Sequence, residues 1–324
     1  MSNNNRDRGI STLKGSFFNT DGNSHEIITN DEAKNIFDFV ISKEQSHRPN
    51  GTPIAGQYHL VRKDNPADEG IVVGSHGVGS QFDVEVQPSQ VMDFFLENIM
   101  PEVPNLKIET VASIKGGALT FANFHYGNSY SLKNDDSPQY TNFLFVNPLT
   151  TGRLQILSHS VRVVCCNTLT QASKCGTGFN ISHTQRAKFY VNMALDALKT
   201  QLAEANRLKE IIVKLDNIKC MSKNIDKILD MVYPVKKTAK ADDVLTGQAK
   251  KAREDAKLRF ESDQSFKEKT AWAFLNAMTF PLEHAKVTAK RTPIAIASDN
   301  LFGNRATKKS QMLSAVMEEF GLSA

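Results

Sequence analysis

The chain has 324 residues, of which 40% are hydrophobic and 23% charged, with only 18 glycines and 11 prolines. This composition is ordinary for a globular protein and excludes a collagen-like or low-complexity chain. No stretch approaches the roughly 18–20 apolar residues that span a membrane, and the polar N-terminus has no apolar signal segment. We therefore expect a soluble, cytoplasmic protein with no membrane partner, whose four cysteines are too few for a disulfide scaffold.

The formal net charge of +4 conceals an uneven distribution. Residues 1–150 carry 11 basic and 18 acidic side chains, a net charge of −7, whereas residues 151–324 carry 28 and 17, a net charge of +11. An excess of positive charge in one half of a chain points to nucleic acid or another polyanion as a partner.

The N-terminal part of the chain predicts a flexible segment followed by a helix. Residues 1–29 are rich in Asn, Ser, Thr and Gly, and we expect them to be flexible. Asn30 is the expected N-cap of a helix that ends before the turn cluster at His47. Its apolar stripe is expected to contain Ile36, Phe37, Val40 and Ile41.

Residues 57–162 consist mainly of short apolar or alternating runs separated by turn residues, which is typical of strands. One helix is expected to interrupt them, over about residues 89–100. Gly116-Gly117 and the turn residues between Asn147 and Gly152 predict two hairpins, so an antiparallel sheet is the economical interpretation.

After residue 185 the apolar residues recur at steps of three and four, the period of a helix. The longest such face runs over about 191–215 and is expected to pack on the sheet. Shorter helices are predicted over about 222–232, from 243 to about 260, from 265 to Pro281, and over about 312–320. The fold class is therefore α+β: an antiparallel hairpin sheet packed by a long helix, with a core domain over 30–233 and a basic helical region over 234–324.

Motifs for nucleotide hydrolysis and metal binding do not occur in the sequence. The chain has no GxxxxGK[ST] and no paired CxxC or HxxxH, although Cys166, Cys175 and His183 lie in one short stretch. Asp83 and Glu85 are expected to share one face of a strand, which is best interpreted as a solvated acidic face. We expect no cofactor, no metal and no catalytic residue.

The segment from Arg162 to Thr184 is the least ordinary part of the chain. Asn167 and Thr168 can cap a helix that runs through Ala172, and basic donors surround this point: Arg162, His183, Arg186 and Lys188. Such an arrangement suits an anion or a phosphate. An equally good interpretation is structural, with Asn167 and Thr168 as a simple cap and Arg162 as the partner of an acidic residue.

The run RVVCCNTLTQA, followed by ISHT and a long helix, resembles the family built around domain of unknown function 932. The similarity extends upstream through GIVVGSHGVGSQFDVEVQPSQVMDFFLENI and downstream through TAWAFLNAMTFPLEH. The segment Asn147–Gly152 lacks the His-Asp-Gly turn associated with many members, and Pro281 interrupts a helix that is regular in others. The resemblance implies a phage- or plasmid-encoded protein in the cytoplasm of a host cell, but no particular activity.

The leading expectation is a protein that binds single-stranded DNA or another nucleic acid, with ATP-independent annealing in recombination or DNA maintenance as its role, acting as a homo-oligomer. The expected contacts are Arg153, Arg162, Asn167, Thr168, His183, Arg186, Lys188, Lys250, Arg253, Lys257 and Arg291, and further backbone contacts are expected from Lys236, Lys237, Lys251, Arg305, Lys308 and Lys309. Two alternatives stay open: a protein-binding inhibitor or regulator of a host defence system, with a host protein as partner, and a metal-dependent hydrolase or nuclease.

Two details of this interface can be stated as expectations. Lys250, Arg253 and Lys257 lie along one helical stripe and can meet a phosphate backbone together, unless they form a solvated surface that Glu254 and Asp255 partly neutralise. Four aromatic residues are candidates for base stacking or, equally, for the core: Phe124, His125, Tyr126 and Tyr130.

Overall fold

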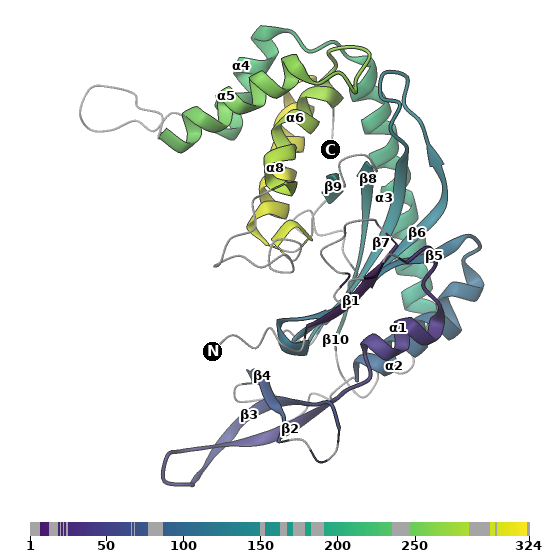
Figure 1. The fold of residues 1–324 in the computed structure, drawn as a ribbon, viewed down its shortest axis with the longest axis vertical. Helices are drawn as coiled ribbons and strands as arrows, with labels where there is room; N and C mark the ends of the chain where they lie inside the picture. Colours follow the sequence, from purple (N-terminus) through teal and green to yellow (C-terminus); the bar gives the residue numbers. More distant parts are fainter. Residues whose placement is uncertain are drawn as a thin grey trace. The chain divides into compact units, whose positions relative to one another are not determined.

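The computed structural model describes residues 7–12, 19, 21, 23, 25–65, 67, 69–76, 87–149, 153–162, 167–170, 179–182, 191–234, 247–284, 299–301 and 303–322. Helices and antiparallel sheets both occur, which confirms the α+β class (Figure 1). The chain divides into two compact units. The first, which we call the sheet unit, contains residues 1–127, 142–158 and 173–202; the second, the helical unit, contains 128–141, 159–172 and 203–324.

The larger sheet is built from the hairpins that the glycine and proline turns predict. Its strands follow the order β1 (Arg8–Ser11), β5 (Leu106–Ile114), β6 (Leu119–Tyr130), β7 (Gln139–Pro148), β8 (Arg153–Arg162) and β10 (Phe179–Ser182), and β9 (Asn167–Thr170) pairs with β8. Gly116 and Gly117 form the turn between β5 and β6 with φ values of 70° and 108°, a backbone conformation that favours glycine. Strand β1, within the segment expected to be flexible, pairs with β5.

The predicted N-terminal helix is shorter than expected. Helix α1 covers Asn30–Ile36, and Val40 and Ile41 begin strand β2 (Val40–His47) instead of continuing the helical stripe. The expectation was wrong because β-branched residues also suit a strand, and β2 finds an antiparallel partner in β3 (Pro53–Lys63). Strand β4 (Ile71–His76) completes this second, three-stranded sheet.

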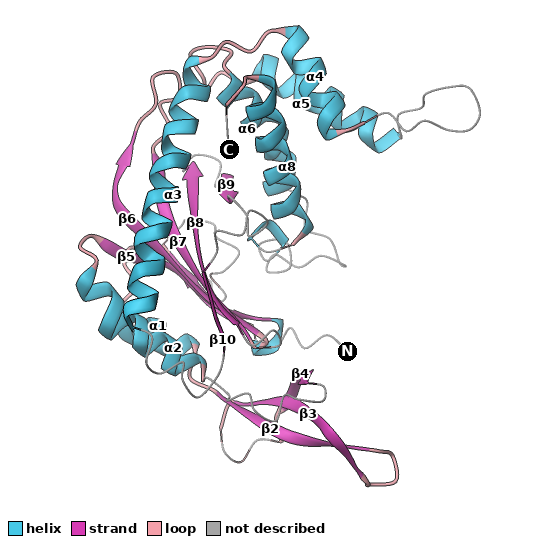
Figure 2. Cartoon of the chain, turned by 180° about the vertical axis from the view of Figure 1, so that it is seen from behind, coloured by secondary structure: helices cyan, strands magenta, loops and turns pink. Residues whose placement is uncertain are grey.

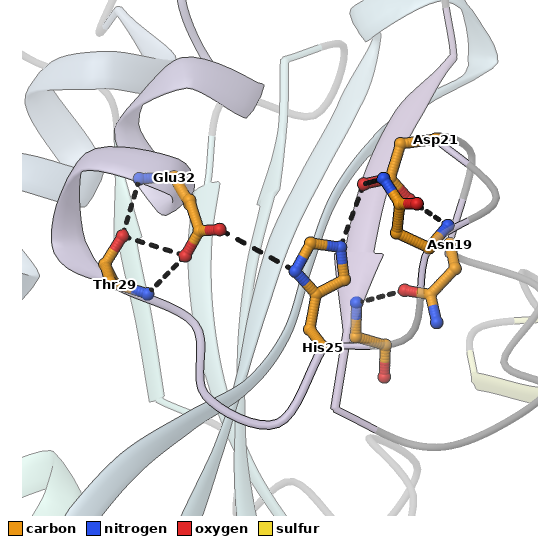
Figure 3. A network of polar contacts seen from close by, with 7 residues as sticks. Asn19, Asp21, His25, Thr29 and Glu32 are labelled. Carbon is orange, nitrogen blue, oxygen red and sulfur yellow. Dashed lines mark hydrogen bonds and ion pairs between the residues drawn. The ribbon is translucent and has the colours of Figure 1, made fainter.

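Thr29, and not Asn30, caps helix α1. Its hydroxyl accepts a hydrogen bond from the Glu32 amide at 3.2 Å, and the Glu32 carboxylate accepts one from the Thr29 amide at 2.8 Å. This reciprocal arrangement is a capping box. Figure 3 shows the His25 ring between this carboxylate and Asp21, with nitrogen–oxygen distances of 3.7 Å and 2.9 Å. The polar network thus ties the chain before α1 to the N-terminal end of the helix.

Helices cover one face of the larger sheet in the sheet unit. The expected helix over 89–100 forms as α2 (Pro88–Phe94), a π-helical turn (Phe95–Ile99) and a 3₁₀ turn (Met100–Glu102). The Phe95 ring stacks on Phe124 of β6, with 4.7 Å between the centroids. The first half of the long helix α3 (Val191–Asn217) adds Ala197 and Leu198 to the same core, so this half packs on the sheet as expected (Figure 2), whereas Leu208 and Leu215 of the second half belong to the core of the helical unit.

The helical unit has a core of its own. Its helices are α4 (Ser222–Val232), α5 (Gly247–Ser262), α6 (Ala271–Glu283) and α8 (Asn304–Glu319), together with the second half of α3. Helix α6 begins at its Thr270 cap and not near Ser265, and it retains Pro281 in its last turn. The buried Trp272 donates its indole N–H to Asp135 at 2.9 Å. Among the helices that the structure describes, none is both long and apolar enough to cross a membrane.

Candidate nucleic-acid interface

Helix α5 carries the basic stripe that the sequence predicts, and its buried face explains its orientation. Ala256 and Phe260 are buried, and the Phe260 ring meets Phe274 of α6 edge to face at 5.3 Å. The side of α5 away from α6 is exposed and carries Lys250 and Lys251. The helix therefore holds one apolar face in the core and presents a basic face to solvent.

The three cations of the predicted stripe are not equivalent. Lys257 lies 2.7 Å from the Asp226 carboxylate, and the Arg253 guanidinium lies 2.6 Å from Asp230. Both acids belong to α4 and are four residues apart, as are the two cations, so the two helices meet in an antiparallel ladder of ion pairs. Lys250 is exposed and has no ion-pair partner among the described residues.

The acidic partners expected from the sequence are therefore replaced by others. Glu254 and Asp255, which neighbour the stripe in sequence, form no ion pair with it within the described part of the chain, whereas Asp226 and Asp230 neutralise two of its three cations. Of the three cations of the stripe, Lys250 is thus the one without a carboxylate partner among the described residues.

A stacked group of three side chains lies where α5 and α6 end. The guanidinium carbon of Arg259 lies 4.1 Å from the centroid of the Phe280 ring. The His284 ring stacks on Phe280 with 4.0 Å between the centroids and 32° between the planes. Arg259 and His284 are exposed, so planar cationic and aromatic groups are presented to solvent. We call these three residues the Arg–Phe–His stack.

The end of α5 is fixed next to this stack. The Lys269 ammonium donates hydrogen bonds to the carbonyls of Phe260, of Glu261 at 2.9 Å and of Asp263 at 3.4 Å. A cation at the carboxyl end of a helix also interacts favourably with the helix dipole. Lys269 thus stabilises the turn that carries Arg259. The stack was not predicted from the sequence, although Phe280 and His284 are four residues apart, a spacing that places two side chains on one face of a helix.

The expected anion site at a helix N-terminus is not formed by Asn167 and Thr168. Both residues belong to strand β9, which pairs antiparallel with β8 so that Arg162 lies opposite Asn167. The expectation of a helix was wrong because Thr168 and Thr170 are β-branched and the β8 edge offers a ladder of backbone hydrogen bonds. The backbones of Arg153 and Arg162 also lie in β8.

The remaining predicted contacts divide into three groups: residues outside the described part of the chain, buried residues, and the half-buried Lys308. His183, Arg186, Lys188, Arg291, Lys236 and Lys237 lie outside the described residues. Arg305 and Lys309 are buried, with Lys309 at 0% exposure, so the expectation that they contact phosphates was wrong. The Lys308 ammonium donates to the Val232 carbonyl at 2.8 Å and lies over the Tyr233 ring.

The aromatic residues proposed for base stacking are mostly structural. Phe124 is fully buried, and the Tyr126 ring packs against Phe143 with 5.7 Å between the centroids. His125 is half-buried beside Asn142, and burial lowers the pKa of its imidazole. Tyr130 is partly exposed, with the Lys209 ammonium 4.6 Å from its ring centroid.

The described residues offer no clear site for metal or thiol chemistry. They contain no group of three or more His, Cys, Asp and Glu side chains placed to hold a metal ion. Cys220 is buried, and burial raises the pKa of its thiol to about 12, so its reactive thiolate form is suppressed. Cys165, Cys166, Cys175 and the pair Asp83 and Glu85 lie outside the described side chains.

Comparison with protein families identifies the chain. The family described as "Domain of unknown function (DUF932)" matches residues 76–314, which include β5 to β10 and the helices as far as α8. The chain belongs to this family. Comparison with curated proteins and comparison with solved structures gave no match. The matched region contains the RVVCCNTLTQA segment, which carries the resemblance noted above, and both helices of the Arg–Phe–His stack.

Proposed function

We propose that this DUF932 protein binds nucleic acid, with single-stranded DNA as its ligand, through the exposed surface of α5 and the end of α6. The observation that carries this proposal is the Arg–Phe–His stack on an exposed helix end, beside a basic helix. Proteins that bind single strands combine cations that meet the backbone with planar side chains on which bases stack. Arg259 and His284 supply such planar groups, and Lys250 and Lys251 supply charge.

The charge of the two units supports the same assignment. The residues of the helical unit include 24 Lys and Arg against 18 Asp and Glu, a net charge of +6, whereas those of the sheet unit carry 15 against 17, a net charge of −2. A polyanion is therefore attracted to the helical unit and weakly repelled by the sheet unit.

The experiment that tests this function measures the affinity of the full chain for a fluorescently labelled oligothymidylate over a series of salt concentrations. For single strands the logarithm of the binding constant falls with the logarithm of salt by about 0.7 for each phosphate neutralised. We expect a steep fall for the wild type. Absence of binding, or binding that salt does not change, would refute the assignment.

Matched variants locate the binding surface. Phe280→Leu with Arg259→Gln removes the stack, and loss of stacking on one base corresponds to about 1–3 kcal/mol, or roughly 5- to 150-fold in affinity. Lys199→Gln is the control, because Lys199 is an exposed cation of the sheet unit whose side chain is 76% accessible. We expect it to bind like the wild type. If both variants lose the same affinity for the oligonucleotide, binding depends on the overall positive charge of the chain and not on the stack.

The narrower expectations belong to this proposal as well. They are a phage or plasmid origin, action in the host cytoplasm, ATP-independent annealing, and a homo-oligomer. Annealing is measured by the pairing rate of complementary labelled strands without ATP, and the oligomer by light scattering of the same sample. A stoichiometric host protein that co-purifies from nuclease-treated lysate would instead favour the inhibitor or regulator, and strand cleavage in Mg²⁺ or Mn²⁺ would favour the nuclease.

A further inference from the structure

The Phe280 ring of α6 holds a flat side chain against each of its two faces. The Arg259 guanidinium carbon and the centroid of the His284 ring lie 4.1 Å and 4.0 Å from the Phe280 centroid. Two flat groups at these distances do not fit on the same face of one ring, so Phe280 is the middle layer of the Arg–Phe–His stack. The outer faces of Arg259 and His284, and not the Phe280 ring, are therefore the surfaces on which a base can stack.

The Arg259 guanidinium is held by a ring and not by an acid. Arg253, which also lies on α5, pairs with Asp230 at 2.6 Å. Arg259 is exposed, and among the described residues its guanidinium has no hydrogen bond and no ion pair. Arginine carries five N–H donors in a flat fork of fixed geometry and stays charged. The edge of this fork is thus open to a ligand while its face lies over Phe280.

We propose that Arg259 binds a base of the single strand through two parallel hydrogen bonds, and that it prefers a base with two adjacent acceptor atoms. This inference rests on the proposed binding of single-stranded DNA. Guanine presents such a pair at O6 and N7, the edge to which arginine most often donates in DNA complexes. An unpaired cytosine presents another pair at N3 and O2, whereas adenine and thymine have no two neighbouring acceptors.

The stack favours a base over a phosphate at this arginine. Arginine stacks on aromatic faces through its flat guanidinium. A base that accepts hydrogen bonds from the edge of a stacked guanidinium lies in the same plane, so it extends the flat layer that Phe280 supports. A tetrahedral phosphate gains no such contact, and the exposed Lys250 and Lys251 on the same helix are available to the backbone. The arrangement separates base recognition from charge neutralisation.

The direct test measures the affinity of the full chain for short labelled oligothymidylates in which one central thymine is replaced. We expect guanine to bind more tightly than adenine, the matched purine, and cytosine more tightly than thymine, by roughly 5- to 150-fold, the equivalent of about 1–3 kcal/mol. If neither base exceeds its matched partner, the proposal is overturned. A gain with only one of the two assigns the site to that base.

A modified base tests the guanine edge itself. 7-Deazaguanine keeps the guanine ring and O6 but lacks the N7 acceptor. We expect it to lose the gain that guanine shows over adenine. If 7-deazaguanine binds as tightly as guanine, the two parallel hydrogen bonds to O6 and N7 are refuted.

Arg259→Lys tests the residue, because lysine keeps the charge but has no flat fork. This variant is expected still to bind oligothymidylate and to lose the preference of guanine over adenine. Arg207→Lys is the matched control, since Arg207 is an arginine of α3 in the helical unit whose side chain is 43% accessible. The control should retain the preference. A preference that survives in Arg259→Lys overturns the assignment.

The same measurements distinguish this inference from the proposed function. If oligothymidylate binds with a steep salt dependence but replacement of the central base changes nothing, single-strand binding stands and the base preference fails. If no strand binds, with or without guanine or cytosine, both fail.

Discussion

Each of the two units buries a cation completely, but they neutralise it differently. In the sheet unit, the Arg62 guanidinium donates to Asp64 at 2.8 Å and 3.0 Å and to the Gly116 carbonyl at 3.1 Å, and it lies 4.0 Å from the Phe39 ring centroid. In the helical unit, the buried Lys309 ammonium pairs with the Glu283 carboxylate. The Asp64 side chain is 22% exposed and keeps contact with water, whereas Glu283 is 7% exposed. The energetic consequence of losing the cation should therefore differ between the units.

The largest effect is expected for Lys309→Met. This change removes the cation that pairs with the buried Glu283 carboxylate, and breaking a buried pair in this way typically costs about 3–5 kcal/mol. Urea unfolding followed by circular dichroism measures the loss. The double variant with Glu283→Leu is expected to recover most of it, since apolar residues of similar size often replace a buried pair without loss. If Lys309→Met is as stable as the wild type, the core does not hold the Glu283 carboxylate away from water.

Arg62→Met is expected to destabilise the chain less, by about 2 kcal/mol, because it leaves the Gly116 carbonyl without this donor, whereas Asp64 keeps its ion pair with Arg8 at 3.2 Å and its contact with water. The site is closely packed: a Cβ added at Gly117 would lie 2.9 Å from Cδ of Arg62, and Gly117 has a φ of +108°. Gly117→Ala should therefore destabilise the same region without removing any charge. If Arg62→Met lowers the free energy of unfolding as much as Lys309→Met does, the solvent exposure of the acidic partner does not decide how much stability is lost.

A smaller, pH-dependent effect is expected from Glu109 in the sheet unit. Its buried carboxylate accepts hydrogen bonds from Asn123 at 2.5 Å and from Asn142 at 2.8 Å, and burial raises its pKa above the usual 4.5 despite these bonds. As the pH rises above 4.5, the unfolded chain loses this proton before the folded chain does, so the free energy of unfolding falls until the pH passes the folded-state pKa.

Glu109→Gln removes the titrating group and should flatten that part of the stability profile. In this variant the side-chain amide of Asn123 or Asn142 must flip, so that its oxygen accepts a hydrogen bond from the new glutamine. A flip of Asn123 leaves the contact between Asn142 and His125 unchanged. Urea unfolding between pH 4.5 and pH 8 compares the two slopes. Identical slopes for the variant and the wild type would mean that Glu109 does not contribute to the pH dependence.

The sequence predicted those parts of the fold that depend on neighbouring residues. The turn at Gly116-Gly117 and the long apolar face of α3 are local patterns, and both were confirmed. The strand at Val40–His47 was missed because the same apolar residues suit a helix or a strand, and only pairing with β3 decides between them.

The candidate interface shows the same limit. The three cations of α5 were placed on one helix from their spacing alone, but their partners were sought at Glu254 and Asp255, the acidic residues nearest in sequence. Lys257 instead meets Asp226, 31 residues away on α4. Helix packing determines which acidic residues neutralise a basic stripe. A single sequence does not state how its helices pack.

The smallest change in stability, and the sharpest test of the interface, is expected for Asp226→Asn with Asp230→Asn. Exposed ion pairs contribute about 0.2–1 kcal/mol each, so the double variant should fold with little loss. Arg253 and Lys257 are then released from carboxylates, and the salt dependence of binding to oligothymidylate should steepen, by about 0.7 in slope for each additional phosphate contact. Asp196→Asn, which removes an exposed acid from the sheet unit, is the matched control. If both variants bind DNA alike, Arg253 and Lys257 hold α5 against α4 and do not contact the strand.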